Sequence, residues 1–329
     1  MGTYSFDFGP FTISGAPGTG DAPVAYGPRR TVLDKLLVDA ASEAGAEVRE
    51  GFTVSDVVFD DDRVIGVRGH GRNGPTVTEH ARVVVGADGV HSRVAQAVRP
   101  GQYHDKPRLQ CSYYTYYSGL AMDGRFEGYI RPGRAFAALA THDGLAVVIG
   151  GWPFPEFEAG RKDIEGNWLN MLELAPSFAE RIRAANRETR FTGTAVPNFF
   201  RKPFGPGWAL VGDAGYTRDF ITAQGITDAF RDAELCATAL DQTFGGACSF
   251  EVAMARYQST RDQHVLPMYE FTTQLATLQP PPPELAKLLE AVHGNTEAMD
   301  AFARVNAGVT SPAEFFSDDN VERIYAMAG

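Results

Sequence analysis

The stretch Trp208–Leu240, WALVGDAGYTRDFITAQGITDAFRDAELCATAL, decides the fold of this chain. It opens with four apolar residues, the length of a short buried strand, and then reaches Gly212-Asp213, where glycine permits a tight turn. A loop leads to Gln224-Gly225, and beyond it apolar residues recur at helical spacing: Ile226, Ala229, Phe230, Ala233, Ala237 and Leu240. We therefore expect a strand, a turn and a helix that buries this apolar face.

Such a strand–turn–helix unit is suited to hold a polar ligand. The Asp213 carboxylate can accept hydrogen bonds from sugar-type hydroxyls, and the start of the helix presents unpaired N–H groups to an acceptor or anion. Asp228 lies in the expected first turn, where a negative charge suits the helix dipole. A plain strand-to-helix corner, with Asp213 capping a loop, explains this stretch alone equally well.

A second unit of the same kind precedes it in the chain. Residues 82–85 form a short apolar strand, Gly86-Ala87-Asp88-Gly89 a tight turn, and residues 91–98 a helix with Ser92 near its start. Residues 69–74 match the dinucleotide-binding pattern G-x-G-x-x-G. However, Pro75 and a β-branched run follow them instead of a helix, so we expect a hairpin turn there and no dinucleotide site.

Together the two units resemble the para-hydroxybenzoate hydroxylase-like FAD-dependent monooxygenases, the aromatic hydroxylase family. Gly86, Ala87, Asp88, Gly89, Ser92 and Val94 match one family motif, and Gly212, Asp213, Ala223, Gln224, Gly225, Asp232 and Ala233 match the other. The resemblance extends from about Tyr4 to Leu278 and implies FAD as cofactor, with NAD(P)H as possible electron donor. It implies that Asp213 contacts the ribityl chain, that the helix start at Gln224, Gly225 and Ile226 faces the pyrimidine edge of the flavin, and that the Asp88 turn lies near the pyrophosphate.

Arg29 and Arg30 are candidates for cofactor phosphate binding. They precede an expected helix over residues 31–44, whose apolar residues Val32, Leu33, Leu36, Leu37 and Ala40 share one face. Two cations at a helix start oppose the local dipole, which favours a bound anion. The resemblance implies that the arginine of an R-x-x-L helix reaches the FAD phosphates, and Arg30 fits that spacing. Two solvated surface arginines are the alternative.

The region between the motifs reads as an antiparallel meander, which the resemblance identifies as the substrate domain. One strand carries four tyrosines, Tyr113, Tyr114, Tyr116 and Tyr117, and only one alternating pair can face a pocket. Core packing explains such a stripe as well as a binding wall does. Phe220 stands near the expected flavin ring, where the family usually has proline, and we count it among the substrate candidates.

The expected fold is α/β: a doubly wound FAD/NAD(P)-binding-like domain with an antiparallel substrate domain. We expect residues 1–105 and 190–245 in the first, 106–189 in the second, and helices over 246–329. The family's opening strand, G-x-G-x-x-G turn and helix have no counterpart before Arg29, so the first domain is expected to be incomplete. An upstream segment or a partner chain would then supply the ADP-binding unit.

The implied function is FAD-dependent monooxygenation of a small apolar or aromatic substrate; no catalytic base is identifiable. The alternative is a flavin-free protein of the same fold, acting as a binding protein or cofactor-independent enzyme. A net charge of −11 argues against nucleic acid or anionic membranes as partners. Three cysteines without metal spacing favour free thiols in a reducing cytoplasm, and no apolar run is long enough for a membrane span.

Overall fold

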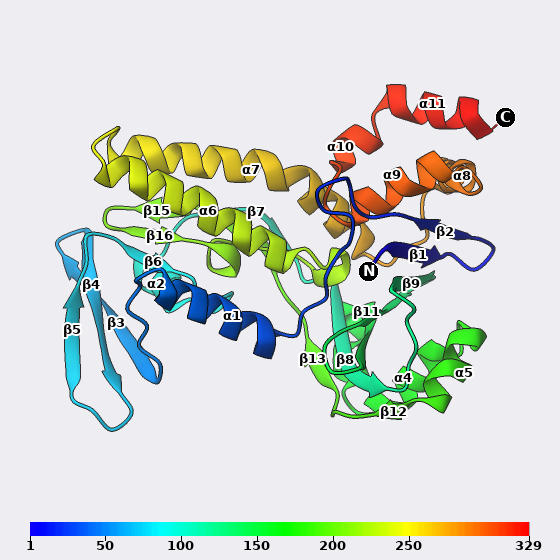
Figure 1. Cartoon of the computed structure of the whole chain (residues 1–329), viewed down its shortest axis with the longest axis horizontal. Coiled ribbons are helices and arrows are strands. Elements are labelled where there is room, and N and C mark those ends of the chain that lie inside the picture. The colour runs from blue at the N-terminus through cyan, green and yellow to red at the C-terminus, as the bar shows by residue number, and fades with distance from the viewer. Residues whose placement is uncertain (329) are drawn as a thin grey trace. The chain divides into compact units, whose positions relative to one another are not determined.

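The chain folds as two units, which are described separately (Figure 1). The computed structural model describes residues 1–328. Unit 1 combines Met1–Leu33 and Arg108–Val196 with the chain from Pro267 onward, and unit 2 combines Asp34–Pro107 with Pro197–Leu266. Both units mix strands with helices, so the expected α/β class is confirmed.

Unit 1 is built on an eight-stranded sheet of order β12-β8-β11-β10-β9-β1-β2, in which β13 also pairs with β8. Paired strands are antiparallel, except that β1 runs parallel to β9 with Ser5 opposite Glu127. The bounds are β1 Thr3–Asp7, β2 Thr12–Gly15, β8 Gln110–Ser118, β9 Arg125–Arg131, β10 Arg134–Ala140, β11 Leu145–Pro153, β12 Asn186–Arg187 and β13 Thr192–Thr194.

Two hydrophobic cores hold unit 1 together. In the first, alternate residues of β8 and β11 pack against α4 (Ile164–Leu172) and α5 (Pro176–Ala184). Pro176 opens α5, a position where the missing N–H of proline costs no helical hydrogen bond. In the second, β1 and β2 pack against four C-terminal helices: α8 Pro283–Val292, α9 Thr296–Asn306, α10 Pro312–Phe315 and α11 Asp318–Ala328.

These cores explain why the units differ from the expected domain boundaries. Residues 1–33 lie in unit 1, and not in the FAD-binding-like domain, because β1 extends the sheet at β9. The chain from Pro267 onward joins the same unit because its helices cover β1 and β2, where Phe6 contacts Phe302 in an edge-to-face pair. Neither the parallel pairing of β1 with β9 nor the packing of the C-terminal helices on β1 and β2 is visible in a local sequence pattern.

Unit 2 contains three small sheets. In the first, β6 (Val84–Gly86) and β16 (Trp208–Leu210) run parallel, and β15 (Phe204–Gly205) flanks β16. A meander of β3 Phe52–Asp60, β4 Arg63–Gly71 and β5 Thr76–His80 forms the second, and β7 Gln102–Lys106, β14 Asn198–Arg201 and β17 Tyr216–Thr217 form the third. The hairpin expected around residues 69–74 is confirmed, with Asn73 in a left-handed conformation at its turn.

The helices of unit 2 include α2 (Arg93–Val98), α6 (Gly225–Phe244) and the first part of α7 (Phe250–Leu275). Helix α7 contains Pro267 and continues through this residue. One proline removes a single backbone hydrogen bond, and buried neighbours such as Val265 and Tyr269 hold the helix on either side. No helix among residues 1–328 has the length and hydropathy to cross a bilayer.

Helix α1 (Arg30–Glu43) forms where the sequence predicts a helix, but its apolar face is not buried. None of its residues is buried, and Leu36 is 62% exposed. Local interactions, such as the Lys35–Asp39 ion pair at 2.6 Å, replace core packing here. Residues 46–49 form an irregular connection to β3.

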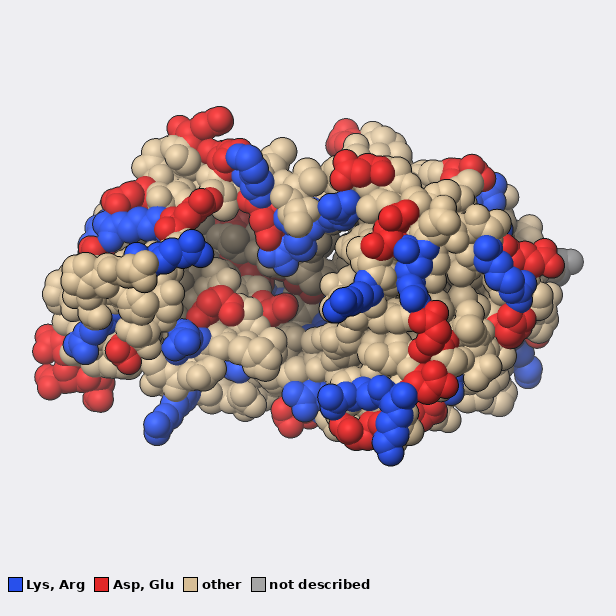
Figure 2. Space-filling view, turned by 90° about the horizontal axis from the view of Figure 1, so that it is seen from below, with Lys and Arg blue, Asp and Glu red and all other residues tan. Residues whose placement is uncertain are grey.

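The surface charge is mixed on the face that Figure 2 shows. Acidic and basic side chains alternate there, without a broad basic area.

Candidate functional site

The two sequence motifs lie side by side in unit 2. Strands β6 and β16 are parallel neighbours, with Val85 opposite Ala209 and Leu210 opposite Gly86. The Asp88 turn follows β6, and a short 3₁₀ helix, η2 (Gly212–Ala214), follows β16. Both turns therefore leave the carboxyl ends of adjacent parallel strands, which is where open α/β sheets bind ligands.

Gly212 has two structural reasons to be glycine. Its φ of +55° lies in the left-handed region, and a Cβ placed on it would lie 3.2 Å from the Cβ of Ala229 in α6. Its N–H donates a hydrogen bond of 3.1 Å to Oδ2 of Asp232. The turn after β16 is therefore held close against α6, and Asp213 is exposed beside it.

The start of α6 is open to a ligand. Gln224 is its buried N-cap residue but makes no side-chain capping bond, whereas Gly225 and Ile226 are exposed. The first hydrogen bond of the helix joins the Asp228 N–H to the Gln224 carbonyl at 2.9 Å. The amides that precede Asp228 therefore point forward with the positive end of the helix dipole, as an acceptor or anion requires.

The face of α6 that packs inward is not the one the sequence predicts. Ile226 is 37% exposed and Phe230 is 45% exposed, whereas Asp228, Asp232, Cys236 and Ala239 are buried. Both carboxylates point inward because their polar partners lie on that side of the helix. Oδ2 of Asp228 accepts from Tyr216 at 2.8 Å and pairs with Arg218 at 2.8 Å, and its Oδ1 pairs with Arg231 at 2.9 Å.

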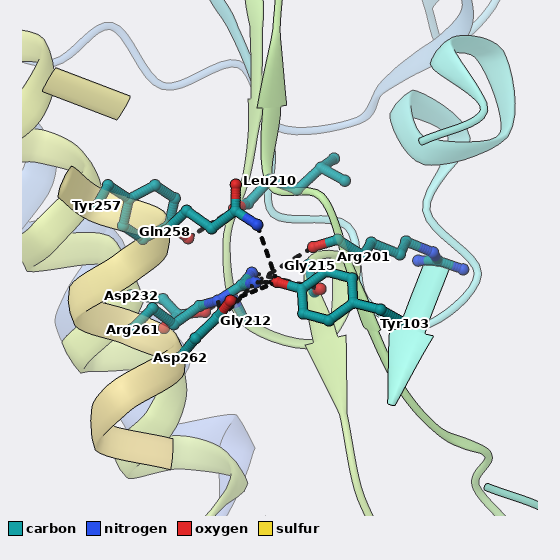
Figure 3. A network of polar contacts seen from close by, with 10 residues as sticks. All are labelled: Tyr103, Arg201, Leu210, Gly212, Gly215, Asp232, Tyr257, Gln258, Arg261 and Asp262. Carbon is teal, nitrogen blue, oxygen red and sulfur yellow. Dashed lines mark hydrogen bonds and ion pairs between the residues drawn. The ribbon is translucent and has the colours of Figure 1, made fainter. Parts of the chain in front are cut away.

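Asp232 belongs to a second buried network, drawn in Figure 3. Burial raises the pKa of Asp232 to about 7, against the opposing effect of Arg261. The fully buried Arg261 donates to Tyr103 at 2.7 Å and pairs with Asp262 at 2.8 Å, and Tyr103 also donates to Asp262 at 2.6 Å. This network ties α7 to β7 behind the Gly212 turn.

Arg201 of β14 connects the two motif turns. Its guanidinium donates to the carbonyl of Ala214 at 2.8 Å and to that of Val90 at 3.4 Å, so it binds the segments after β16 and after β6. Asp88 itself holds the second turn, since its Oδ2 accepts the Arg93 N–H at 2.7 Å at the start of α2. The structure thus gives Asp88 a positioning role, while its contact to a pyrophosphate stays a prediction.

Phe220 lies in the loop between η2 and α6. It opens a 3₁₀ helix, η3 (Phe220–Thr222), and its side chain is half-buried. Asp219 caps this helix by accepting the Ile221 N–H at 3.0 Å, and Asn198 accepts the Asp219 N–H at 2.7 Å. The loop is therefore fixed by polar contacts of Asp219 without the rigid proline that the resemblance leads one to expect.

The remaining candidates belong to unit 1, around strand β8. Arg29 pairs with Asp143 at 3.1 Å, and its guanidinium carbon lies 5.8 Å from the ring centroid of Tyr116; Arg30 begins α1. Tyr114 and Tyr116 form an edge-to-face pair with centroids 6.1 Å apart, and both are half-buried.

Tyr113 and Tyr117 are buried on the opposite face of β8, so the expected alternation is seen. Tyr117 accepts a hydrogen bond from the indole N–H of Trp168 at 3.2 Å and lies in the core. Tyr113 borders a pocket between β8 and the segment before α4.

Sequence reasoning missed Arg201, Arg218, Asp228 and Arg261 as parts of the site. Arg201 and Arg261 carry no local signal, because their partners are distant backbone carbonyls and side chains. Asp228 and Asp232 do carry one: two carboxylates four residues apart must share a helix face. Two acidic residues at this spacing, with apolar residues between them, indicate one shared face of α6.

Comparisons with known proteins agree with this geometry. Residues 21–109 match the family described as FAD binding domain. Among curated proteins, digeranylgeranylglycerophospholipid reductase 1 of Methanopyrus kandleri is 24% identical over 76% of this chain and 67% of its own length. The corresponding reductase of Methanosarcina acetivorans is 28% identical over 66% of this chain. The chain spans only 53% of the latter's length.

Solved structures share the fold at low sequence identity. The myxobacterial halogenase CndH, described as a variant of FAD-dependent halogenases, superposes with a TM-score of 0.77 at 20% identity, over 99% of this chain and 80% of its own. A flavoprotein/dehydrogenase from Cytophaga hutchinsonii gives 0.80 at 17% identity, over 99% and 82%. PqsL, a probable FAD-dependent monooxygenase from Pseudomonas aeruginosa, gives 0.66 at 19%, over 92% and 81%.

The fold is the one seen in these FAD-dependent proteins, and residues 21–109 match an FAD binding domain. Its two motifs resemble those of the para-hydroxybenzoate hydroxylase-like FAD monooxygenases, and the fold similarity to PqsL agrees with this resemblance.

Proposed function

We propose that the protein is an FAD-dependent monooxygenase for a small apolar or aromatic substrate, with NAD(P)H as electron donor. The observation that carries the proposal is the convergence of three features in unit 2. The exposed Asp213, the Asp88 turn and the uncapped start of α6 all belong to the carboxyl-terminal edge of β6 and β16 or to the helix packed against it.

The residues present fit the flavin half of an FAD site. Bound FAD would supply the redox and oxygen chemistry. The carboxylate of Asp213 accepts hydrogen bonds from ribityl hydroxyls, and the first amides of α6 stabilise negative charge on the acceptor that they face. The buried ion pairs of Asp228 and the Gly212–Asp232 hydrogen bond fix the helix start and the Gly212 turn relative to each other.

The substrate surface that we favour is the face of β8 with Tyr114 and Tyr116. Arg29, a candidate for cofactor binding, lies on this same face beside Tyr116. Two half-buried aromatic rings provide apolar contact area together with hydroxyl groups that can orient a substrate. Burial raises the pKa of Tyr116, so its hydroxyl is neutral and available as a hydrogen-bond donor at neutral pH.

The adenosine and pyrophosphate of FAD need a further protein segment in this proposal. Strand β6 is an edge strand whose Val85 is 40% exposed, and α1 leaves Leu36 and Leu37 exposed. An added parallel strand and helix would bury these apolar residues and complete the sheet. We propose that such a strand–turn–helix segment, from the same protein or from a partner, holds the ADP portion of FAD.

An absorption spectrum and an FAD titration of the purified 329-residue chain test this proposal. Three or four hydrogen bonds of about 1 kcal/mol each must offset the ordering of a large ligand. We therefore expect a colourless protein that binds FAD with a Kd between micromolar and millimolar, about 4–8 kcal/mol. Flavin retained through dialysis would contradict the need for a further segment.

A second protein separates this need from the function itself. It carries an added strand, G-x-G-x-x-G turn and helix ahead of the chain, together with Phe220→Pro to relieve crowding beside the ring. Tight FAD binding and NAD(P)H oxidation by this protein would support the proposal. Failure to bind FAD at millimolar concentration would refute it and favour a flavin-free protein of the same fold.

A further inference from the structure

A pocket of unit 1 lies on the face of β8 opposite Tyr114 and Tyr116. The pocket, of about 110 Å³, opens between the sheet and the segment that leads into α4. The segment consists of a 3₁₀ helix, η1 (Phe154–Glu156), and α3 (Phe157–Gly160). Its lining includes Cys111, Tyr113, Trp152, Glu156, Ile164 and Asn167.

The Tyr113 hydroxyl distinguishes this pocket from a simple packing defect. Tyr113 is 6% exposed, it borders the pocket, and its OH group has no hydrogen-bond partner among the described residues. A buried hydroxyl without a partner costs about 1–3 kcal/mol, so proteins rarely keep one. In contrast, the buried hydroxyl of the nearby Tyr117 has a partner, because it accepts a hydrogen bond from the indole N–H of Trp168. The Tyr113 hydroxyl can therefore form one hydrogen bond with a molecule bound in the pocket.

The walls restrict the occupant to a flat and apolar molecule. The rings of Tyr113 and Trp152 meet edge to face with centroids 5.8 Å apart, and Ile164 adds an aliphatic surface. An engineered apolar cavity of about 150 Å³ holds benzene, so a pocket of about 110 Å³ accepts at most a single small ring.

The charges around the pocket restrict the occupant to a neutral molecule. Its one charged lining residue, Glu156, is already paired through both oxygens with Arg134, at 3.1 and 2.8 Å. Among residues 1–328, no cationic side chain lines the pocket, although the charges of Arg161 and Glu158 act on Tyr113 with opposite signs. Burial also raises the pKa of Tyr113, so its hydroxyl stays protonated and can either donate or accept a hydrogen bond.

We propose that this pocket binds a neutral single-ring aromatic molecule with one polar atom, of the phenol class, through the Tyr113 hydroxyl. The proposal does not rest on FAD binding, because every residue of the pocket belongs to unit 1. It adds an accessory site to the proposed substrate face, since Tyr113 and Tyr114 point to opposite sides of the same strand.

Fluorine NMR titration of the full chain with 4-fluorophenol and fluorobenzene tests the proposal. The wild-type protein should give saturable shifts with both probes. Tyr113→Phe should weaken 4-fluorophenol about fivefold, the value of one hydrogen bond, and leave fluorobenzene unchanged. Ile164→Phe, which adds volume to the pocket wall, should abolish both shifts. The matched control Tyr114→Phe, on the opposite face of the strand, should change neither.

Two results would overturn the proposal. Absence of a saturable shift with either probe in the wild-type protein would mean that the pocket holds only water. An equal loss of both probes in Tyr113→Phe, or no loss of either, would show that the hydroxyl recognises nothing. Circular dichroism of each variant verifies that a lost shift does not come from a lost fold.

Discussion

The substitution Asp232→Asn should remove a pH dependence from the stability of unit 2. Asp232 is fully buried, and burial raises its pKa from 3.8 to about 7. The folded state therefore binds a proton more tightly than the unfolded state does, so this group favours folding below about pH 4 and loses that contribution as pH rises to about 7. A shift of about 3 units at about 1.4 kcal/mol each gives about 4 kcal/mol as an upper estimate.

Asparagine resembles the protonated form of Asp232 and keeps an oxygen for the Gly212 N–H. The free energy of unfolding of the wild type, relative to Asp232→Asn, should therefore fall by up to about 4 kcal/mol between about pH 4 and pH 7 and level off above. Urea unfolding measures this difference. Trp152→Phe and Trp168→Phe in both proteins leave Trp208, which lies in unit 2, as the only tryptophan reporter.

Asp241→Asn is the matched control, because Asp241 is an exposed carboxylate on the same helix. Its stability should follow that of the wild type at every pH. Parallel pH curves for the wild type and Asp232→Asn would refute the reasoning, since they would mean that Asp232 keeps its ordinary pKa in the folded protein.

Two further substitutions test the Gly212 turn. Gly212→Ala should destabilise the protein by about 1–3 kcal/mol in urea unfolding, because alanine is strained at a φ of +55° and its Cβ meets Ala229. The control Gly225→Ala should be nearly neutral, because its Cβ would enter open space. Asp213→Ala should weaken FAD binding by about 1.5–3 kcal/mol in an absorbance titration, the value of a hydrogen bond to a charged group; unchanged affinity would remove Asp213 from the site.

Local sequence patterns predict the elements of this fold well and their burial poorly. The strand–turn–helix units at Asp88 and Gly212, the meander and the break at Pro176 all follow from glycine, proline and alternating apolar residues. The parallel pairing of β1 with β9 joins segments more than a hundred residues apart, and no local pattern encodes it. Periodicity also assumes that apolar residues face the core. This is wrong for α1, which buries none of its residues, and for Ile226 and Phe230 of α6, which are exposed.

The exception at α6 explains how the site is positioned. Apolar contacts are non-directional, so a helix packed only by apolar residues can rotate or slide by a fraction of a turn at little cost. Hydrogen bonds and ion pairs fix both distance and angle. By turning Asp228 and Asp232 inward, α6 exchanges the burial of Ile226 and Phe230 for directional contacts with Arg218 and Gly212. The open amides at its start are then held in one place, which is what electrostatic stabilisation of a bound ligand requires.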